Sequence, residues 1–282
     1  MAEAFDMPKG QLMRGKRGVV LGVANHQSIA WGIASQLAAQ GAELALGYME
    51  MNEKRVKPLG ESIGVKTFVT FDAMQQGSIP ALFAEVAKTF PKIDFLVHAL
   101  GFAERSQIAG SFIENAERGA FLRAMDASVY SWVEAAQCAA PMMDRDGSMI
   151  TMTYLGSERA IPNYNTMGVC KAALEAATRY IARDLGPRGI RVNAISAGAV
   201  RTLSLAGIKD GRGMLSAGRS LSAMKEDTTV EGVAGCALWL LSDLGRSTTG
   251  EVVHVDAGFH MMGLPSEDEA APAAAAATTT AS

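Results

Sequence analysis

The chain has 282 residues, of which 49% are hydrophobic and 6% aromatic, and its 26 basic and 29 acidic side chains leave a formal charge of -3. This length predicts one domain around a continuous core, and the balanced charge argues against a nucleic-acid partner or a membrane-surface partner. Since no uncharged apolar run approaches the roughly 20 residues that cross a bilayer, we expect a cytoplasmic protein.

Short apolar runs that end in Gly or Asp alternate with Ala-rich helical stretches, a pattern typical of βαβ units around a parallel sheet. After a leader over residues 1–14, the expected strands are Gly18–Gly22, Glu43–Tyr48, Lys66–Asp72, Ile93–Leu100, Ser148–Tyr154, Arg191–Ser196 and Glu251–Asp256. The expected helices are Ser28–Gln40, Glu53–Ile63, Ile79–Phe90, Glu117–Met143, Tyr164–Leu185 and Val230–Leu241. The sequence therefore predicts one α/β domain over residues 15–264, Rossmann-like and doubly wound, with a seven-stranded parallel sheet flanked by helices on both faces.

The final stretch, residues 265–282, is rich in alanine and threonine and lacks the branched apolar side chains of a core. Such a composition predicts a disordered tail outside the domain.

The first strand is followed by a segment with the features of a phosphate-binding turn. Gly22 ends the strand, and Ser28 precedes a helix that contains Gly32. A helix N-terminus presents unpaired N–H groups and a positive dipole to a pyrophosphate, although the spacing differs from the usual G-x-G-x-x-G. A simple tight turn at Gly22 and a helix cap at Ser28 remain an alternative.

The later strand ends support a dinucleotide site, because ligands of such sheets bind at the carboxyl ends of the strands. Asp72 closes the third strand, where an adenine could be held, and Gly101 follows the fourth. The second strand ends in Tyr48-Met49-Glu50, without an arginine for a 2′-phosphate, which favours NADH; Lys54 and Arg55 leave NADPH open.

The most informative segment joins Tyr154, Tyr164 and Lys171. On a helix, the seven-residue step from Tyr164 to Lys171 is about 700°, which returns both side chains to one face about 10.5 Å apart along the axis. Structural readings are also open, since Tyr154 could pack in the core at a strand end and Lys171 could be a solvated helix residue.

The run YLGSERAIPNYNTMGVCKA, residues 154–172, resembles the NADH-type bacterial enoyl-[acyl-carrier-protein] reductases of the short-chain dehydrogenase/reductase superfamily. Their pattern is YLG-x-E-R-x-x-P-N-Y-N-x-M-G-x-x-K-A, whereas the commoner members of the superfamily place Tyr and Lys four residues apart. The similarity extends from about Gly15 to Met262 and includes DFLVHALGFA, RVNAISAG and GEVVHVDAGFH.

The resemblance implies reduction of the trans-2 double bond of an enoyl thioester on acyl-carrier protein, in type II fatty acid synthesis. Tyr164 would donate a hydrogen bond to the enolate oxygen, and Lys171 would anchor the ribose of the cofactor. Tyr154 stands where ordinary members carry a catalytic serine. We expect the nearby ammonium to lower the pKa of Tyr164.

The resemblance also implies the contacts of the site and the assembly of the chain. Cofactor contacts would come from Gly22, Ser28, Ile29, Asp72, Ala73, Gly101, Lys171, Val200 and Thr202, and substrate contacts from Ala103, Tyr154 and Tyr164. A homotetramer is implied, with the helices Glu117–Met143 and Tyr164–Leu185 packing across a dyad.

The chain departs from the family pattern at three places. Ala199-Val200 and Glu104 replace residues that are usually proline, and residues 208–229, the expected lid over the acyl chain, are rich in glycine rather than in proline and aromatic residues. We therefore expect a flexible lid. A carbonyl reductase and a catalytically divergent nucleotide-binding paralogue remain as alternatives.

No metal or disulfide site is predicted. The four histidines are dispersed, and the three cysteines are far apart in Ala-rich stretches, as expected of small buried hydrophobic residues. The residues are His26, His98, His254, His260, Cys138, Cys170 and Cys236.

Overall fold

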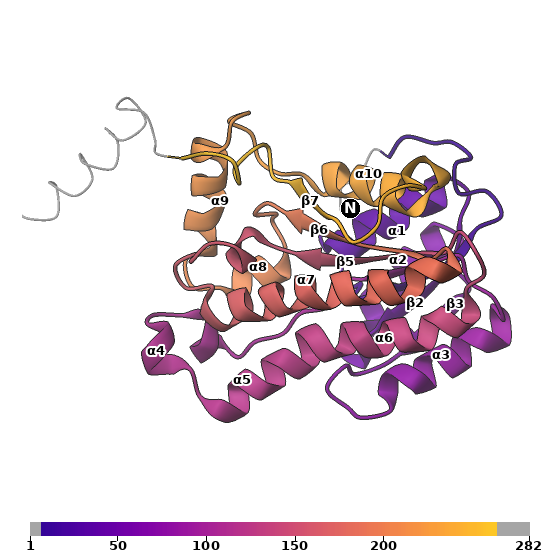
Figure 1. Cartoon of the computed structure of the whole chain (residues 1–282), viewed down its shortest axis with the longest axis horizontal. Helices are drawn as coiled ribbons and strands as arrows, with labels where there is room; N and C mark the ends of the chain where they lie inside the picture. The colour runs from indigo at the N-terminus through magenta and orange to yellow at the C-terminus, as the bar shows by residue number, and fades with distance from the viewer. Residues whose placement is uncertain (1–6, 264–282) are drawn as a thin grey trace, which may run out of the picture.

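A computed structural model describes residues 7–263, in which seven parallel strands form one sheet in the order β3-β2-β1-β4-β5-β6-β7 (Figure 1). The strands are β1 Arg17–Leu21, β2 Glu43–Tyr48, β3 Thr67–Thr70, β4 Phe95–His98, β5 Ser148–Thr153, β6 Arg191–Ala197 and β7 Val252–Val255. The order turns back between β1 and β4, which is the switch point of a doubly wound sheet. The predicted α/β architecture is confirmed, while the predicted disordered tail lies outside the described residues.

Helices cover both faces of the sheet (Figure 1). Their bounds are α1 Ile29–Ala39, α2 Glu53–Ser62, α3 Ser78–Thr89, α4 Phe112–Asn115, α5 Arg118–Met125, α6 Ser131–Ala139, α7 Asn165–Leu185, α8 Leu203–Gly207, α9 Gly211–Leu221 and α10 Val230–Leu241. The apolar faces of α1 and α10 bury one side of the sheet, and those of α3, α6 and α7 bury the other.

The alternation of side chains along β1 shows how the strands serve both layers. Val20 packs into the core under α1 and α10, whereas Val19 and Leu21 pack into the core under α3 and α6. Successive side chains of a strand point to opposite faces, so a central strand that is covered on both sides is apolar throughout.

The long helix predicted over Glu117–Met143 is interrupted. A π-helical turn, Asp126–Tyr130, separates α5 from α6. The hydroxyl of Ser131 donates a 2.8 Å hydrogen bond to the carbonyl of Ala127, so a side chain competes for a carbonyl of the wide turn. A serine hydroxyl that bonds to a backbone carbonyl does not change the spacing of the apolar residues. The sequence therefore predicts one continuous helix.

The segment 208–229 contains helix α9, which the sequence did not predict because glycine is a poor helix former. Asp210 begins this helix, and its carboxylate accepts from the N–H of Gly213 at 3.2 Å. This cap satisfies a donor at the helix start. The flexibility expected of the lid stays a prediction.

The described part of the N-terminal leader packs against the domain. Met7 and Met13 are buried, and the side-chain amides of Gln36 and Gln40 both donate to the carbonyl of Pro8, at 3.1 and 2.7 Å. These contacts hold the outer side of α1. Within residues 7–263, no helix combines the length and the apolar character needed to cross a bilayer.

Gly18 lies opposite Phe95 in the pairing of β1 with β4, and the fully buried ring of Phe95 occupies the space of a side chain. A Cβ at position 18 would lie 2.2 Å from Cδ2 of that ring. We expect Gly18→Ala to lower the free energy of unfolding by about 1–3 kcal/mol, because an overpacked core must shift. Urea titration measures this change.

Gly186→Ala is the matched control, because a Cβ there meets nothing within 4 Å and its φ of -52° suits alanine. Equal stability of Gly18→Ala and the original chain would contradict this account of the β1–β4 contact.

Candidate active site

A cavity of about 660 Å³ opens at the carboxyl edge of the sheet, where the loops after β1, β4, β5 and β6 meet. Ten of the residues predicted for the site line it: Gly22, Ser28, Ile29, Gly101, Ala103, Tyr154, Tyr164, Lys171, Val200 and Thr202. Asp72 and Ala73 lie outside this lining, after β3, where the Asp72 carboxylate accepts from the N–H of Met74 at 2.9 Å. Their contact with an adenine stays a prediction.

The loop after β1 is held by its own hydrogen bonds and leaves the start of α1 facing the cavity. Gly22 has a φ of 102°, and a Cβ there would lie 2.3 Å from the carbonyl oxygen of Ala99. The hydroxyl of Ser28 does not cap the helix; it donates to the carbonyl of Asn25 at 2.7 Å. The N–H of Trp31 donates to the carbonyl of Ser28 at 2.9 Å, so the N–H groups of Ile29 and Ala30 are the ones available for an anion.

Lys171 is a buried lysine in the wall of this cavity. Its ammonium donates a 2.8 Å hydrogen bond to the carbonyl of Met152, which is the penultimate residue of β5 and lies two residues before Tyr154. Burial lowers the pKa of Lys171 to about 8, against the smaller raising effects of Cys170 and Glu175. The alternative of a solvated surface lysine is wrong.

Tyr164 lies in the same wall, but the expected helical geometry is wrong for it. Helix α7 begins one residue later, at Asn165, whose φ of 43° is left-handed. Tyr164 and Lys171 are therefore not joined by two regular helical turns, although both side chains line the cavity. Asn163, with a φ of 64°, is left-handed as well, and a hydrophobic period cannot signal left-handed residues.

Two glycines bring Tyr164 close to the end of β5. A Cβ at Gly156 would lie 2.3 Å from Cδ1 of the Tyr164 ring, and a Cβ at Gly168 would lie 2.6 Å from the carbonyl oxygen of Gly156. The ring of Tyr164 also meets that of Tyr154 edge to face, with centroids 4.8 Å apart. The two phenols thus occupy one restricted position.

Both phenols are protonated at neutral pH. Burial, followed by the influence of Tyr154, raises the pKa of Tyr164 well above its usual range. Burial, followed by the charge of Asp256, raises the pKa of Tyr154 to about 12. The expectation that an ammonium lowers the pKa of Tyr164 is contradicted, because desolvation dominates. The phenols can therefore act as hydrogen-bond donors.

The turn after β4 rests on buried hydroxyls that no sequence motif signals. Ser128, in the π-helical turn, accepts from the N–H of Phe102 at 3.0 Å. His98 and Ser131 lie within 2.9 Å of each other, and Ser131 donates onward to Ala127, so Nε2 of His98 carries the proton. The π-helical turn thus fixes the loop that carries Gly101.

The outer part of the cavity is apolar. Ile108, Tyr164 and Met167 form a buried cluster against which Ala103, Ile161, Ile208 and Met214 pack. Flexible thioethers and branched carbons suit an acyl chain. Glu104 lines the cavity and forms an ion pair with the exposed Arg123 at 2.6 Å, so the departure at position 104 places a carboxylate in the cavity wall.

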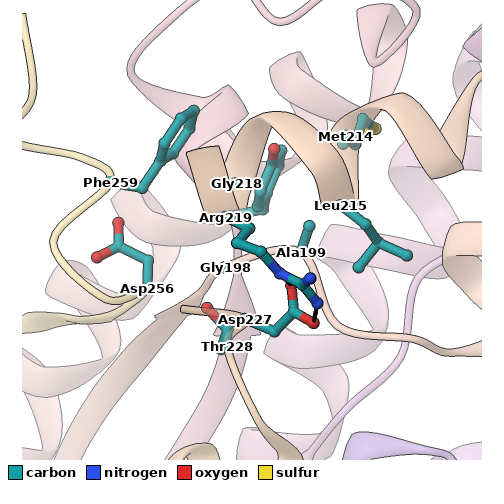
Figure 2. Close-up of a pocket in the computed structure, with 11 residues that line it drawn as sticks. Gly198, Ala199, Met214, Leu215, Gly218, Arg219, Asp227, Thr228, Asp256 and Phe259 are labelled. Carbon is teal, nitrogen blue, oxygen red and sulfur yellow. Dashed lines mark hydrogen bonds and ion pairs between the residues drawn. The ribbon is translucent and has the colours of Figure 1, made fainter. Parts of the chain in front are cut away.

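Helix α9 lies over the loop that follows β6 (Figure 2). Figure 2 shows Arg219 of this helix paired with Asp227, while Asp256 and Phe259 lie at the other side of a small cavity of about 10 Å³. A Cβ at Gly198 would clash with the hydroxyl of Thr228, so the chain passes closely here. The segment 208–229 therefore packs directly against the end of β6.

The residues present fit a dinucleotide. The cavity volume lies in the range of about 300–1,000 Å³ typical of cofactor sites, and it extends from the N-terminus of α1 to Lys171. Among residues 7–263, no group of three or more His, Cys, Asp or Glu side chains could hold a metal ion. The described cysteines are free thiols.

The parallel doubly wound sheet, the helix N-terminus at its crevice and the buried Tyr164 and Lys171 define the class of the short-chain dehydrogenases and reductases. A family model described as Enoyl-(Acyl carrier protein) reductase matches residues 22–260. The chain belongs to this enoyl-[acyl-carrier-protein] reductase family.

Individual relatives cover most of the chain. Enoyl-[acyl-carrier-protein] reductase [NADH] 2 of Rhizobium meliloti is 49% identical over 255 residues, 90% of this chain and 95% of the relative. The NADH enzyme of Escherichia coli is 44% identical over 253 residues, 89% of this chain and 97% of the relative. The crystal structure of the Anaplasma phagocytophilum reductase with NAD has a TM-score of 0.88 at 48% identity, covering 93% of this chain and all of that one.

The close packing at Gly156 predicts the effect of one methyl group. We expect Gly156→Ala to displace the ring of Tyr164 and to lower enoyl reductase turnover about 100-fold, because small displacements of a reacting group are costly. Steady-state kinetics measures turnover, and NADH fluorescence measures cofactor binding, which should stay close to that of the unaltered chain.

Ser157→Ala is the control from the same segment. The Ser157 hydroxyl is buried and has no hydrogen-bond partner among the described residues, so its removal should leave turnover intact. Full activity of Gly156→Ala would show that the position of the Tyr164 ring does not limit the reaction.

Proposed function

We propose that this protein is an NADH-dependent enoyl-[acyl-carrier-protein] reductase that reduces the trans-2 double bond of enoyl thioesters in type II fatty acid synthesis. The observation that carries the proposal is the joint presence of buried Tyr164 and Lys171 and an apolar acyl-sized surface in one cavity. The family membership and the names of the relatives support it. We further propose that it acts in the cytoplasm.

When bound, a reduced nicotinamide supplies the hydride that the β-carbon of the enoyl thioester accepts. The N–H groups at the start of α1 would hold the pyrophosphate, and Gly101, Val200 and Thr202 would line the nicotinamide end. Lys171, fixed by the Met152 carbonyl, would hold the ribose hydroxyls with a full positive charge. These residues orient the cofactor and add favourable charge.

Tyr164 provides the hydrogen bond that the substrate needs. Its O–H would donate to the thioester carbonyl oxygen, which becomes negatively charged as the double bond is reduced. Because burial raises its pKa, the phenol keeps its proton while it stabilises that oxygen. Tyr154, in contact with the Tyr164 ring, would border the same carbonyl together with Ala103.

The cofactor preference follows from the end of β2. Tyr48-Met49-Glu50 places a carboxylate and no arginine at this turn, which favours a ribose hydroxyl over a 2′-phosphate. The names of the relatives and the NAD in the Anaplasma phagocytophilum structure support the same preference. We propose that residues 208–229 close over the acyl chain and exclude water from the hydride path.

Self-association into a homotetramer is part of the proposal. Exposed apolar side chains lie along the outer faces of α5, the π-helical turn and α7, namely Leu122, Tyr130, Val169 and Tyr180. Burying these side chains against another subunit would remove apolar surface from water. We propose that these helices pack across a dyad.

A reductase assay tests the function. Crotonyl thioesters and longer trans-2-enoyl thioesters, on both acyl-carrier protein and coenzyme A, are expected to oxidise NADH with a higher kcat/KM than NADPH. Reduction of acetoacetyl thioesters instead would identify a carbonyl reductase, and nicotinamide binding without turnover of any enoyl substrate would identify a non-catalytic paralogue.

Two substitutions test the assignments. We expect Tyr164→Phe to lower kcat about 100-fold with little change in cofactor affinity, as for the loss of one oxyanion donor. Lys171→Ala should abolish cofactor binding or turnover, since it removes the ribose anchor. Steady-state kinetics and NADH titration separate the two effects, and unaltered kinetics in both variants would refute the assignments.

A further inference from the structure

Lys171 carries a charge in an environment that does not favour one. Its side chain is 7% exposed, and its hydrogen-bond partner, the carbonyl of Met152, offers only a partial charge. A buried ammonium is costly unless a nearby opposite charge and hydrogen bonds compensate for it. A group on the elements that pack around Lys171 must therefore compensate the positive charge of its ammonium.

Most titratable groups that face Lys171 are neutral near pH 7. Burial, followed by the charge of Lys171, lowers the pKa of His98 on β4 to about 3, and burial raises the pKa of Cys170 on α7 to about 11. Burial also keeps the phenols of Tyr154 and Tyr164 protonated. The remaining group among the described residues that acts on Lys171 is the carboxyl of Glu175.

Glu175 is placed to serve this role. It lies four residues after Lys171, on the same face of α7, and is also 7% exposed. Its Oε1 accepts a hydrogen bond of 2.5 Å from the hydroxyl of Thr153. This hydrogen bond fixes the side chain of Glu175 against the end of β5.

The two helix residues are therefore fixed by two consecutive residues of β5. Met152 holds the ammonium of Lys171, and Thr153 holds the carboxylate of Glu175. Thr153 directly precedes Tyr154, so the end of β5 positions Glu175, Lys171 and the Tyr154 phenol together. Glu175 is buried and does not line the cavity, so we expect it to act through Lys171 and not by contact with a ligand.

We propose that Glu175 is a positioning residue for Lys171: held by Thr153, it supplies the buried negative charge that keeps the Lys171 ammonium charged and directed at the cavity. The catalytic meaning of this pair rests on the proposed function, whereas the charge of Lys171 can be measured without any ligand.

Replacing the carboxylate tests the proposal. Glu175→Gln keeps the size and a hydrogen-bond acceptor for Thr153 but removes the charge. With ¹³Cε-labelled lysine in the full chain, the Lys171 signal, assigned with Lys171→Arg, should titrate about 1 pH unit lower in Glu175→Gln. Glu175→Asp, which retains the charge, should recover most of this shift.

The kinetic readout is a pH profile. In Glu175→Gln, the decline of kcat/KM on the alkaline side should begin about 1 pH unit earlier, while kcat near pH 6 stays close to that of the unaltered chain. Asp184→Asn is the matched control, since it removes an exposed carboxylate from the same helix and should move neither titration.

If Glu175→Gln does not fold, the double variant Thr153→Val/Glu175→Met replaces both partners by apolar groups of similar shape and should show the same lowered Lys171 titration. An unchanged Lys171 titration in these variants overturns the proposal, whether or not the protein reduces enoyl thioesters. A lowered titration in a protein without reductase activity supports the pair and refutes the proposed function alone.

Discussion

The hydrogen bond from the ammonium of Lys171 to the carbonyl of Met152 is the contact on which the cavity depends. It ties α7 to the end of β5 and places a positive charge where four strand ends meet. Since the charge is buried, the surroundings must supply compensation, and the neutral His98 and the Thr153–Glu175 hydrogen bond are arranged accordingly. The same contact between α7 and β5 therefore determines both the packing of the site and the position of its buried charge.

The phenols are placed by space rather than by charge. Gly156 and Gly168 remove the atoms that would separate Tyr164 from the end of β5, and the ring of Tyr154 closes the remaining side. Burial then keeps both hydroxyls protonated. Gly156 and Gly168 can thus be as important for the reaction as Tyr164 itself, because they allow the position of its ring.

The sequence was sufficient for the parallel sheet, since alternating apolar runs and Ala-rich helices determine the layers, and it was sufficient to bring Lys171 and both tyrosines into one cavity. It was insufficient where a single residue changes the backbone. Helix α7 begins at the left-handed Asn165, which leaves Tyr164 outside the helix, and the hydroxyl of Ser131 accompanies a π-helical turn within the predicted long helix. The sign of the pKa shift of Tyr164 also depends on burial, which the sequence does not quantify.

The hydrogen bonds of Gln36 and Gln40 to the carbonyl of Pro8 also affect the opposite end of α1. Two glutamine amides of α1 share one carbonyl of a segment that precedes the first strand, so the end of α1 opposite the cavity is tethered from outside the sheet. A helix that is held at its C-terminal end changes its orientation less at its N-terminal end. The orientation of the first turn of α1, which we propose to hold the pyrophosphate, therefore depends in part on residues before β1, and a chain shortened to β1 would lose this support.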